Sequence, residues 1–152
     1  MKPALQLEGY HFDKIRISAN EGDFEGPPDH TVHTKIQCGA SDEDPHRWRI
    51  ILDIETGVKE EGGSIPPYDI GVQVVGYFSE SLEDQTMEER QDLVVINGGS
   101  ILFSAAREFL LSVTGRSSRG PYKLPTIRFA KVSKAPDEAA ITGEPAQSKE
   151  EG

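Results

Sequence analysis

The segment GGSILFSAAREFLLSVTGRSSRG, residues 98–120, constrains the fold more than any other part of the sequence. It predicts one long helix that begins after two glycines and ends near a third, Gly115. On a helical wheel its apolar residues cover roughly half of the circumference, more than a surface helix needs. An arc of this width predicts burial on two sides, one against the chain's own sheet and one against a sister subunit. A central helix inside a larger core is the alternative.

Four strands are predicted ahead of this helix from the alternation of apolar and polar residues. The first, within residues 5–17, has an apolar phase that slips near Gly9 and Asp13, which indicates bulges or a bend. The others lie within residues 32–38, 48–54 and 68–78, and the last two are expected to be antiparallel because a short connection joins them. Strands followed by helices predict an α+β fold, with a four-stranded antiparallel sheet and helices packed on one face.

Two helices are expected after the strands. Thr86 and Glu89 have the spacing of a capping box and open a short helix toward Ile96. Residues 97–99 interrupt it, and Ser100 is the expected cap of the long helix. The composition then predicts a single domain over residues 1–134 and a disordered acidic tail over residues 135–152.

The formal net charge of −10 argues against a general nucleic-acid binder. Acids predominate in residues 41–94 and bases in residues 115–134, which predicts either complementarity within the chain or electrostatic docking of a partner. No apolar run reaches the length of a signal peptide or a membrane span, and the single cysteine excludes an internal disulfide. We therefore expect a cytoplasmic protein without membrane insertion.

Metal and thiol chemistry have little support in the sequence. His30, His33, Cys38 and His46 are possible zinc ligands, but their spacing matches no metal-site pattern, so we expect no metal. Cys38 alternates in phase with apolar residues of its strand, which favours a buried, inert thiol over a nucleophile.

Two further segments have only weak similarity to anion-binding sites. The NGGS element at residues 97–100 could present helix amides, and the GRSSRG segment at residues 115–120 could hold phosphate through two arginines. A helix break and a surface turn are the favoured interpretations. The acidic pairs lie in polar segments that would not raise a carboxyl pKa, so we expect neither an enzyme nor a cofactor.

Taken in order, LQLEGYHFDKIRISA, WRIILDIETGV and IGVQVVGYFS, and then ILFSAARE with VTGRSSRG and LPTIRF, resemble the bacterial protein-export chaperone family SecB. The most specific piece is ILFSAARE, because the long helix of that family carries an ILFPYARE-like run. The resemblance spans about residues 5–130, which is most of the chain outside the predicted tail.

The resemblance implies subunits paired into dimers and then into a dimer of dimers, a homotetramer, through the long helix. It implies an ATP-independent holdase that binds unfolded polypeptides and delivers them to the SecA motor for export, a step in protein transport and translocation. Some SecB-like proteins instead protect the antitoxin of a toxin–antitoxin system, which is the first alternative. A scaffold or adaptor without chaperone activity is an alternative of another class.

Two departures from the family pattern qualify these expectations. The positions of the acidic motor contacts hold Lys14 and Ser18, and those of a Leu-Cys-Glu element hold residues 69–71, ending in Gly71. Docking on SecA is therefore an open question. The segment after Phe129 is too polar and too rich in proline for the family's second amphipathic helix, which leaves the completeness of the client groove open.

Two sets of apolar residues are candidate functional residues. The candidates for contact with unfolded clients, with core packing as the alternative, are Tyr77, Phe78, Leu82, Ile127 and Phe129. The candidates for the oligomer interface are Phe103, Ala106, Phe109, Leu110 and Val113.

Overall fold

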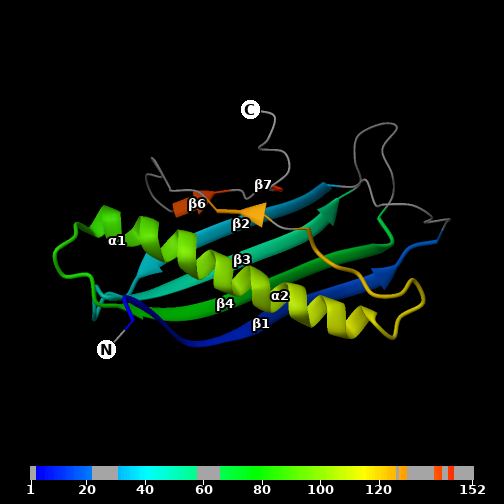
Figure 1. Cartoon of the computed structure of the whole chain (residues 1–152), viewed down its shortest axis with the longest axis horizontal. Coiled ribbons are helices and arrows are strands. Elements are labelled where there is room, and N and C mark those ends of the chain that lie inside the picture. Colours follow the sequence, from blue (N-terminus) through cyan, green and yellow to red (C-terminus); the bar gives the residue numbers. More distant parts are fainter. Residues whose placement is uncertain are drawn as a thin grey trace.

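The computed structural model describes residues 3–21, 31–57, 66–125, 127–129, 139–141 and 144–145 (Figure 1). Long strands come first, a helical stretch follows, and short strands end the described chain. The elements are β1 (Leu5–Ala19), β2 (Thr31–Ala40), β3 (Arg47–Gly57), β4 (Tyr68–Glu80), α1 (Met87–Leu93), the π-helical segment η1 (Val94–Gly98), α2 (Gly99–Thr114), β5 (Ile127–Arg128), β6 (Ala139–Ile141) and β7 (Glu144–Pro145).

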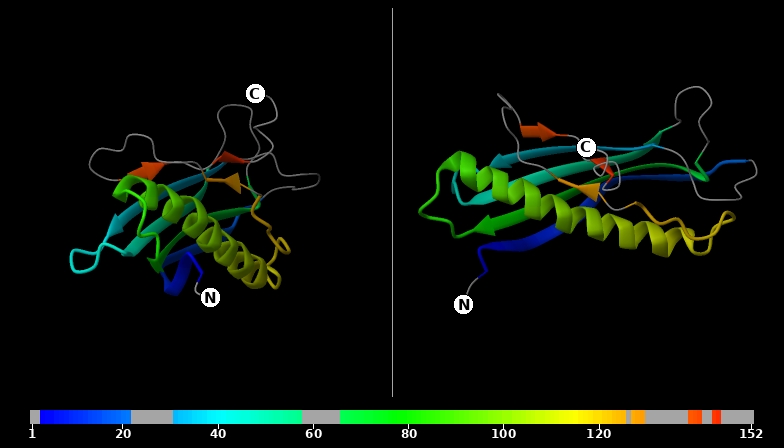
Figure 2. Two further views of the ribbon diagram at one scale, coloured as in Figure 1. Left: turned by 60° about the vertical axis from the view of Figure 1, so that its left-hand side comes forward. Right: turned by 45° about the horizontal axis from the view of Figure 1, so that its top comes forward.

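The strands form an antiparallel sheet in the order β1-β4-β3-β2-β6, which confirms the predicted α+β fold with four long antiparallel strands. The helical stretch crosses one face of this sheet diagonally, as Figures 1 and 2 show. β5 pairs with β7 in a separate small sheet. β6 and β7 fall within residues 135–152, whose remainder lies outside the described residues. The domain boundary and the disordered tail stay predictions.

Two bulges keep the apolar side of β1 turned toward the helices. The register of β1 against β4 shifts between Leu7 and Gly9 and again between Phe12 and Lys14. Each shift places one extra residue in β1, which returns the following apolar side chains to the helix-facing side. The two slips in the apolar pattern of the sequence are therefore bulges, as predicted.

The helices form one continuous stretch, so the predicted break at residues 97–99 is wrong. α1 passes into α2 through the π-helical segment η1, and the backbone stays helical throughout. Ser100 is not a cap, because its hydroxyl donates a hydrogen bond to the Ile96 carbonyl inside the helix. Continuity also removes the free helix-start amides that an anion site at residues 97–100 would need.

The two glycines at this position are explained by the close approach of the helix to the sheet. A Cβ on Gly98 would lie 2.6 Å from Cδ1 of Ile50, and a Cβ on Gly99 would lie 2.9 Å from Cδ1 of Ile36. A side chain at either position would require the helix or the buried isoleucine side chains to shift. A contact with distant residues, rather than local chain geometry, therefore accounts for both glycines.

Both ends of the helical stretch carry the predicted caps. The side chains of Thr86 and Glu89 each accept a hydrogen bond from the backbone N–H of the other residue. Gly115 follows α2 and donates its N–H to the Leu111 carbonyl, although its φ of −59° is helical. The following segment is a turn, as expected, and Gly120 adopts the left-handed φ of 79° there.

The core lies between the sheet and the helical stretch. From α2 it receives Leu102, Phe103, Ala106 and Leu110, all buried. They meet the buried side chains of the strands, which include Ile36, Trp48, Ile50, Leu52, Ile54, Ile70, Val72, Val74 and Phe78. The chain's own sheet thus buries one flank of the apolar arc.

The stretch Met87–Thr114 is long and apolar enough to cross a membrane by length and composition alone, with a best-window mean hydropathy of 1.3. The sequence predicts no such run, and the difference follows from the absence of the break at residues 97–99. The core helix of a soluble protein passes the same test, and here 44% of that window is buried inside the molecule. This criterion does not by itself establish a membrane span.

Candidate functional site

An open hollow of about 700 Å³ lies at one end of the sheet, mostly on the face opposite the helices. Arg49 and Ile51 line it from β3, where they alternate with Ile50, which packs toward the helix. We call this cavity the outer hollow. Its lining residues are Glu8, residues 37–42, residues 47–49, Ile51, Tyr77 and Phe78.

The outer hollow combines an apolar floor with a charged rim. Ile51 and the exposed ring of Tyr77 supply apolar surface, while Arg47 and Arg49 are exposed at the rim. Gly39 stands opposite Arg49 in the β2–β3 pairing, and a Cβ there would meet nothing within 4 Å. The hollow therefore has room above β2 for a side chain from another polypeptide.

A second apolar surface lies on the helix-facing side, where α2 passes over β1. The rings of Phe12 and Phe109 stack there with centroids 4.6 Å apart. Four more large apolar side chains of β1 and α2 are about two-fifths to one-half exposed, namely Tyr10, Ile15, Ile101 and Val113. We call these six residues the β1–α2 strip. Large exposed apolar side chains gathered on two neighbouring elements are typical of interaction sites.

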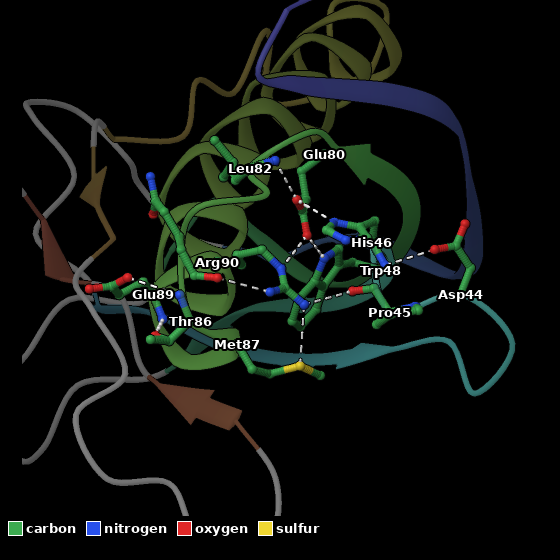
Figure 3. Close-up of polar contacts among 11 residues, drawn as sticks. Asp44, Pro45, His46, Trp48, Glu80, Leu82, Thr86, Met87, Glu89 and Arg90 are labelled. Atoms are coloured by element: carbon green, nitrogen blue, oxygen red, sulfur yellow. Dashed lines mark hydrogen bonds and ion pairs between the residues drawn. The ribbon is translucent and has the colours of Figure 1, made fainter.

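A buried carboxylate ties the end of β4 to α1 beside the outer hollow (Figure 3). The Glu80 side chain is 0% exposed. It accepts hydrogen bonds from Nε1 of Trp48 at 2.9 Å, from Nε of Arg90 at 2.8 Å and from the Leu82 N–H at 2.9 Å. Nδ1 of His46 lies 3.0 Å from Oε1 of the Glu80 carboxylate. We call these residues the Glu80 cluster.

The Glu80 cluster is built to hold a charge, not to transfer a proton. Burial favours the neutral acid and is the largest single influence, yet the hydrogen bonds together lower the Glu80 pKa below its ordinary value. Arg90 also donates to the carbonyls of Gln85 and Pro45. The cluster thus fixes the turn before β3, and with it the rim of the outer hollow, against α1.

The possible metal and thiol residues are separated in the structure. Cys38 is buried, as predicted, and burial raises the pKa of its thiol to about 12, which favours an unreactive cysteine. His46 belongs to the Glu80 cluster, His33 is exposed on β2, and His30 lies outside the described residues. Within the described part of the chain, no group of three or more histidine, cysteine or acidic side chains is placed to hold a metal.

The structure separates the predicted client residues. Tyr77 is exposed and lines the outer hollow, whereas Phe78 is buried under the helix and meets Gly98. Phe129 is also buried, with its ring 6.2 Å from that of Phe103. Leu82 is partly exposed after β4, and the side chain of Ile127 lies outside the description. Core packing therefore accounts for Phe78 and Phe129.

The predicted interface residues also divide into two groups. Phe103, Ala106 and Leu110 are buried within the subunit itself, so in this conformation they contact the core and present no surface to a partner. Phe109 is partly exposed, and Val113 is 40% exposed. The outward flank of α2 is therefore the side that belongs to the β1–α2 strip.

Of the positions that depart from the SecB pattern, Ile70 is buried in the core, and the others lie together on the outer face. Lys14 stands opposite Gln73, and Ser18 stands opposite Asp69, in the pairing of β1 with β4. The Arg16 side chain covers Gly71 and reaches Asp69 at 3.4 Å. The Arg16 side chain thus occupies a surface on which the resemblance to SecB implies acidic residues.

Sequence reasoning missed most of the outer hollow. Ile51 is the detectable signal, because it is an apolar residue at a position of β3 where alternation calls for a polar one. Gly39 carries no comparable signal, since glycine is common near strand ends. Its importance depends on what stands beside it in the sheet.

Comparison with known proteins gives a structural match but no sequence match. No family model matches the chain, and no curated protein matches its sequence. The SecB-like chaperone Rv1957 of Mycobacterium tuberculosis, solved in complex with a ChAD peptide from the antitoxin HigA1, superposes with a TM-score of 0.60 at 14% identity. The match covers 83% of this chain and 92% of that one.

A protein of unknown function from Streptococcus agalactiae gives a TM-score of 0.42 at 13% identity, over 80% of this chain and 97% of that one. That value is too low to support an argument. The match to Rv1957 covers most of both chains at low sequence identity, so it bears on the fold alone. The chain has the fold of the SecB-like chaperones.

Proposed function

We propose that this protein is an ATP-independent holdase that binds unfolded or aggregation-prone polypeptides in the cytoplasm. The observation that carries the proposal is the SecB-like fold over 83% of the chain. The outer hollow, with Ile51 and the exposed ring of Tyr77, provides the apolar binding surface that such a role requires. We assign the chain a binding role and no catalysis.

We assign self-assembly to the β1–α2 strip. It joins an edge strand to the outward flank of the long helix, so a second copy could bury both at once. This reading accounts for the width of the apolar arc, one flank of which the chain's own sheet leaves uncovered. A dimer, or a dimer of dimers, is the expected state, and mass measurement in solution tests it.

Light scattering tests the holdase function. A chemically unfolded, aggregation-prone enzyme is diluted into buffer with the full chain at several-fold excess, without nucleotide. Suppressed scattering is the expected result. The variant Tyr77→Lys, which places a charge in the outer hollow, should suppress less than the outer-face control variant Gln73→Lys, whose charge faces Asp53. Unchanged aggregation with the native chain would favour the scaffold or adaptor alternative.

A role dedicated to a toxin–antitoxin system is the second candidate, because the structural neighbour was solved with an antitoxin peptide. Binding of an antitoxin encoded beside this chain, in preference to a generic unfolded protein, would support it. Delivery to SecA for export is tested by titration with SecA. The basic surface around Arg16 and Lys14 predicts weak binding there, since it replaces acids with bases.

A further inference from the structure

The two long edge strands of the sheet differ in how readily they can accept another strand. β1 is interrupted by two bulges, and bulges twist an edge away from pairing. β2 pairs with β3 in unbroken register from Thr31, opposite Gly57, to Ala40, opposite Trp48. A regular edge of this length is a template for a further strand. Of the two, β2 is the better acceptor.

β6 shows that the β2 edge does accept a strand. It lies antiparallel beside β2 in Figure 1, with Ile36 opposite Ile141 and Cys38 opposite Ala139. β6 is three residues long, whereas β2 has ten. So short a strand contributes few hydrogen bonds, which makes its pairing easy to displace.

The β2 positions next to this pairing open into the outer hollow. Gly39 and Ala40 follow Cys38 along the strand, and both line the cavity. An added strand that continued past Cys38 would bring an outward side chain beside Gly39, where a Cβ meets nothing within 4 Å. Across Gly39 on the same face, the register places Arg49 and then Tyr77, with Ile51 two positions along β3, and all three line the outer hollow. Backbone pairing and a side-chain pocket are therefore adjacent.

We propose that the β2 edge is a strand-acceptor site for extended aliphatic segments of unfolded clients, and that β6 occupies this site within the same chain until a client displaces it. The proposal rests on the holdase function above and specifies how the client is held. Backbone hydrogen bonds recognise any sequence, while the outer hollow selects an apolar side chain. The partner is an extended, aliphatic polypeptide segment.

The first test uses the full chain with the double variant Ala140→Pro/Ile141→Pro, which is designed to release β6 from the β2 edge. We call it the vacated variant. Consecutive residues of a strand direct their N–H groups to opposite edges, so one of the two prolines removes a donor directed toward β2. The control is Ala146→Pro/Gln147→Pro, in the same tail but beyond β6. The probe is a fluorescein-labelled synthetic peptide with the sequence of residues 135–147.

We expect the probe to bind the vacated variant about threefold or more tightly than the native chain, because a tethered strand competes at an effective concentration on the order of millimolar. The control should bind as the native chain does. Equal anisotropy titrations for the native chain and the vacated variant would overturn the proposal.

The second test alters the probe instead of the protein. N-methylation of the peptide at the positions of Ala139, Ala140 and Ile141 removes the donors of either edge, and binding to the vacated variant should fall by about tenfold or more. A peptide methylated at the positions of Thr142 and Gly143 should bind as the unmodified one does. Equal binding of all three peptides would refute strand addition.

The outcomes separate this proposal from the proposed function. One outcome is that the native chain suppresses aggregation, but neither the proline substitutions in β6 nor N-methylation of the peptide changes probe binding. The holdase function then stands, and the β2 edge is not its client site. If the probe responds to both changes but aggregation is unaffected, the edge accepts strands and its assignment to clients is wrong. Support for both requires the vacated variant to suppress aggregation at lower concentration than the native chain.

Discussion

The substitution Glu80→Gln tests whether the Glu80 cluster holds the helical stretch on the sheet. Glutamine keeps the shape but removes the charge from a fully buried group, and it leaves Arg90, which is 11% exposed, without its buried anion. Removing one partner of a buried ion pair costs about 3–5 kcal/mol. Arg90 retains two carbonyl acceptors, so we take the lower end, about 3 kcal/mol.

Urea unfolding measures this loss, and the protein's single tryptophan, Trp48, reports it directly because its ring donates to Glu80. For a chain of this size the loss corresponds to a fall in Tm of about 6–12 °C. The matched control is Glu88→Gln, an exposed acid on the same helix, which should change stability by less than about 0.5 kcal/mol. A Glu80→Gln loss of under about 1 kcal/mol would refute the reasoning.

The pH dependence adds an independent check. The folded pKa of Glu80 is lower than its ordinary value of 4.5, so the unfolded chain binds the proton more tightly. The stabilisation is therefore complete above pH 4.5 and is lost as the pH falls through the folded pKa. The difference between native and Glu80→Gln stability should be constant near neutral pH and should shrink below pH 4.5. A difference that grows on acidification would contradict the assignment.

Three further predictions concern the helix and the thiol. Gly98→Ala should destabilise the fold by about 1–3 kcal/mol in urea unfolding despite the better helix propensity of alanine, whereas Gly39→Ala, in open space, should stay within about 0.5 kcal/mol. Leu110→Asp should unfold the subunit, which circular dichroism would detect as a loss of secondary structure. Val113→Asp should keep the fold but lower the mass of the assembly measured in solution. Cys38 should resist iodoacetamide at pH 8 in the native protein and react rapidly in urea.

The sheet was predictable because its information is local. The alternation in β3 and β4, and even the phase slips of β1, follow from the two-residue period of a strand. The continuity of the helix was not predictable, because Gly98 looks like a break in sequence and is explained only by Ile50, which is far away in the chain. The same limit applies to the oligomer candidates, since a helical wheel cannot tell which part of a wide arc the chain's own sheet covers.

The candidate sites depended still more on contacts between distant residues. The Glu80 cluster draws His46 and Trp48 from one end of β3, Glu80 from the end of β4 and Arg90 from α1. Each residue alone is unremarkable in the sequence. Tyr77 was identified as a candidate from its apolar character at a strand end, but the hollow that it lines is formed by residues of all four long strands.

The two proposed interaction surfaces can act at the same time because they lie at opposite edges of the sheet. The order β1-β4-β3-β2 places the β1–α2 strip at one edge and the strand-acceptor edge at the other. The strip lies on the helix-facing side, whereas the outer hollow opens mostly on the opposite face. Assembly through β1 and α2 therefore leaves one β2 edge and one outer hollow free in each subunit. Client binding should then saturate at one extended segment per subunit whatever the number of subunits, and a stoichiometry that falls on assembly would place the client on the strip instead.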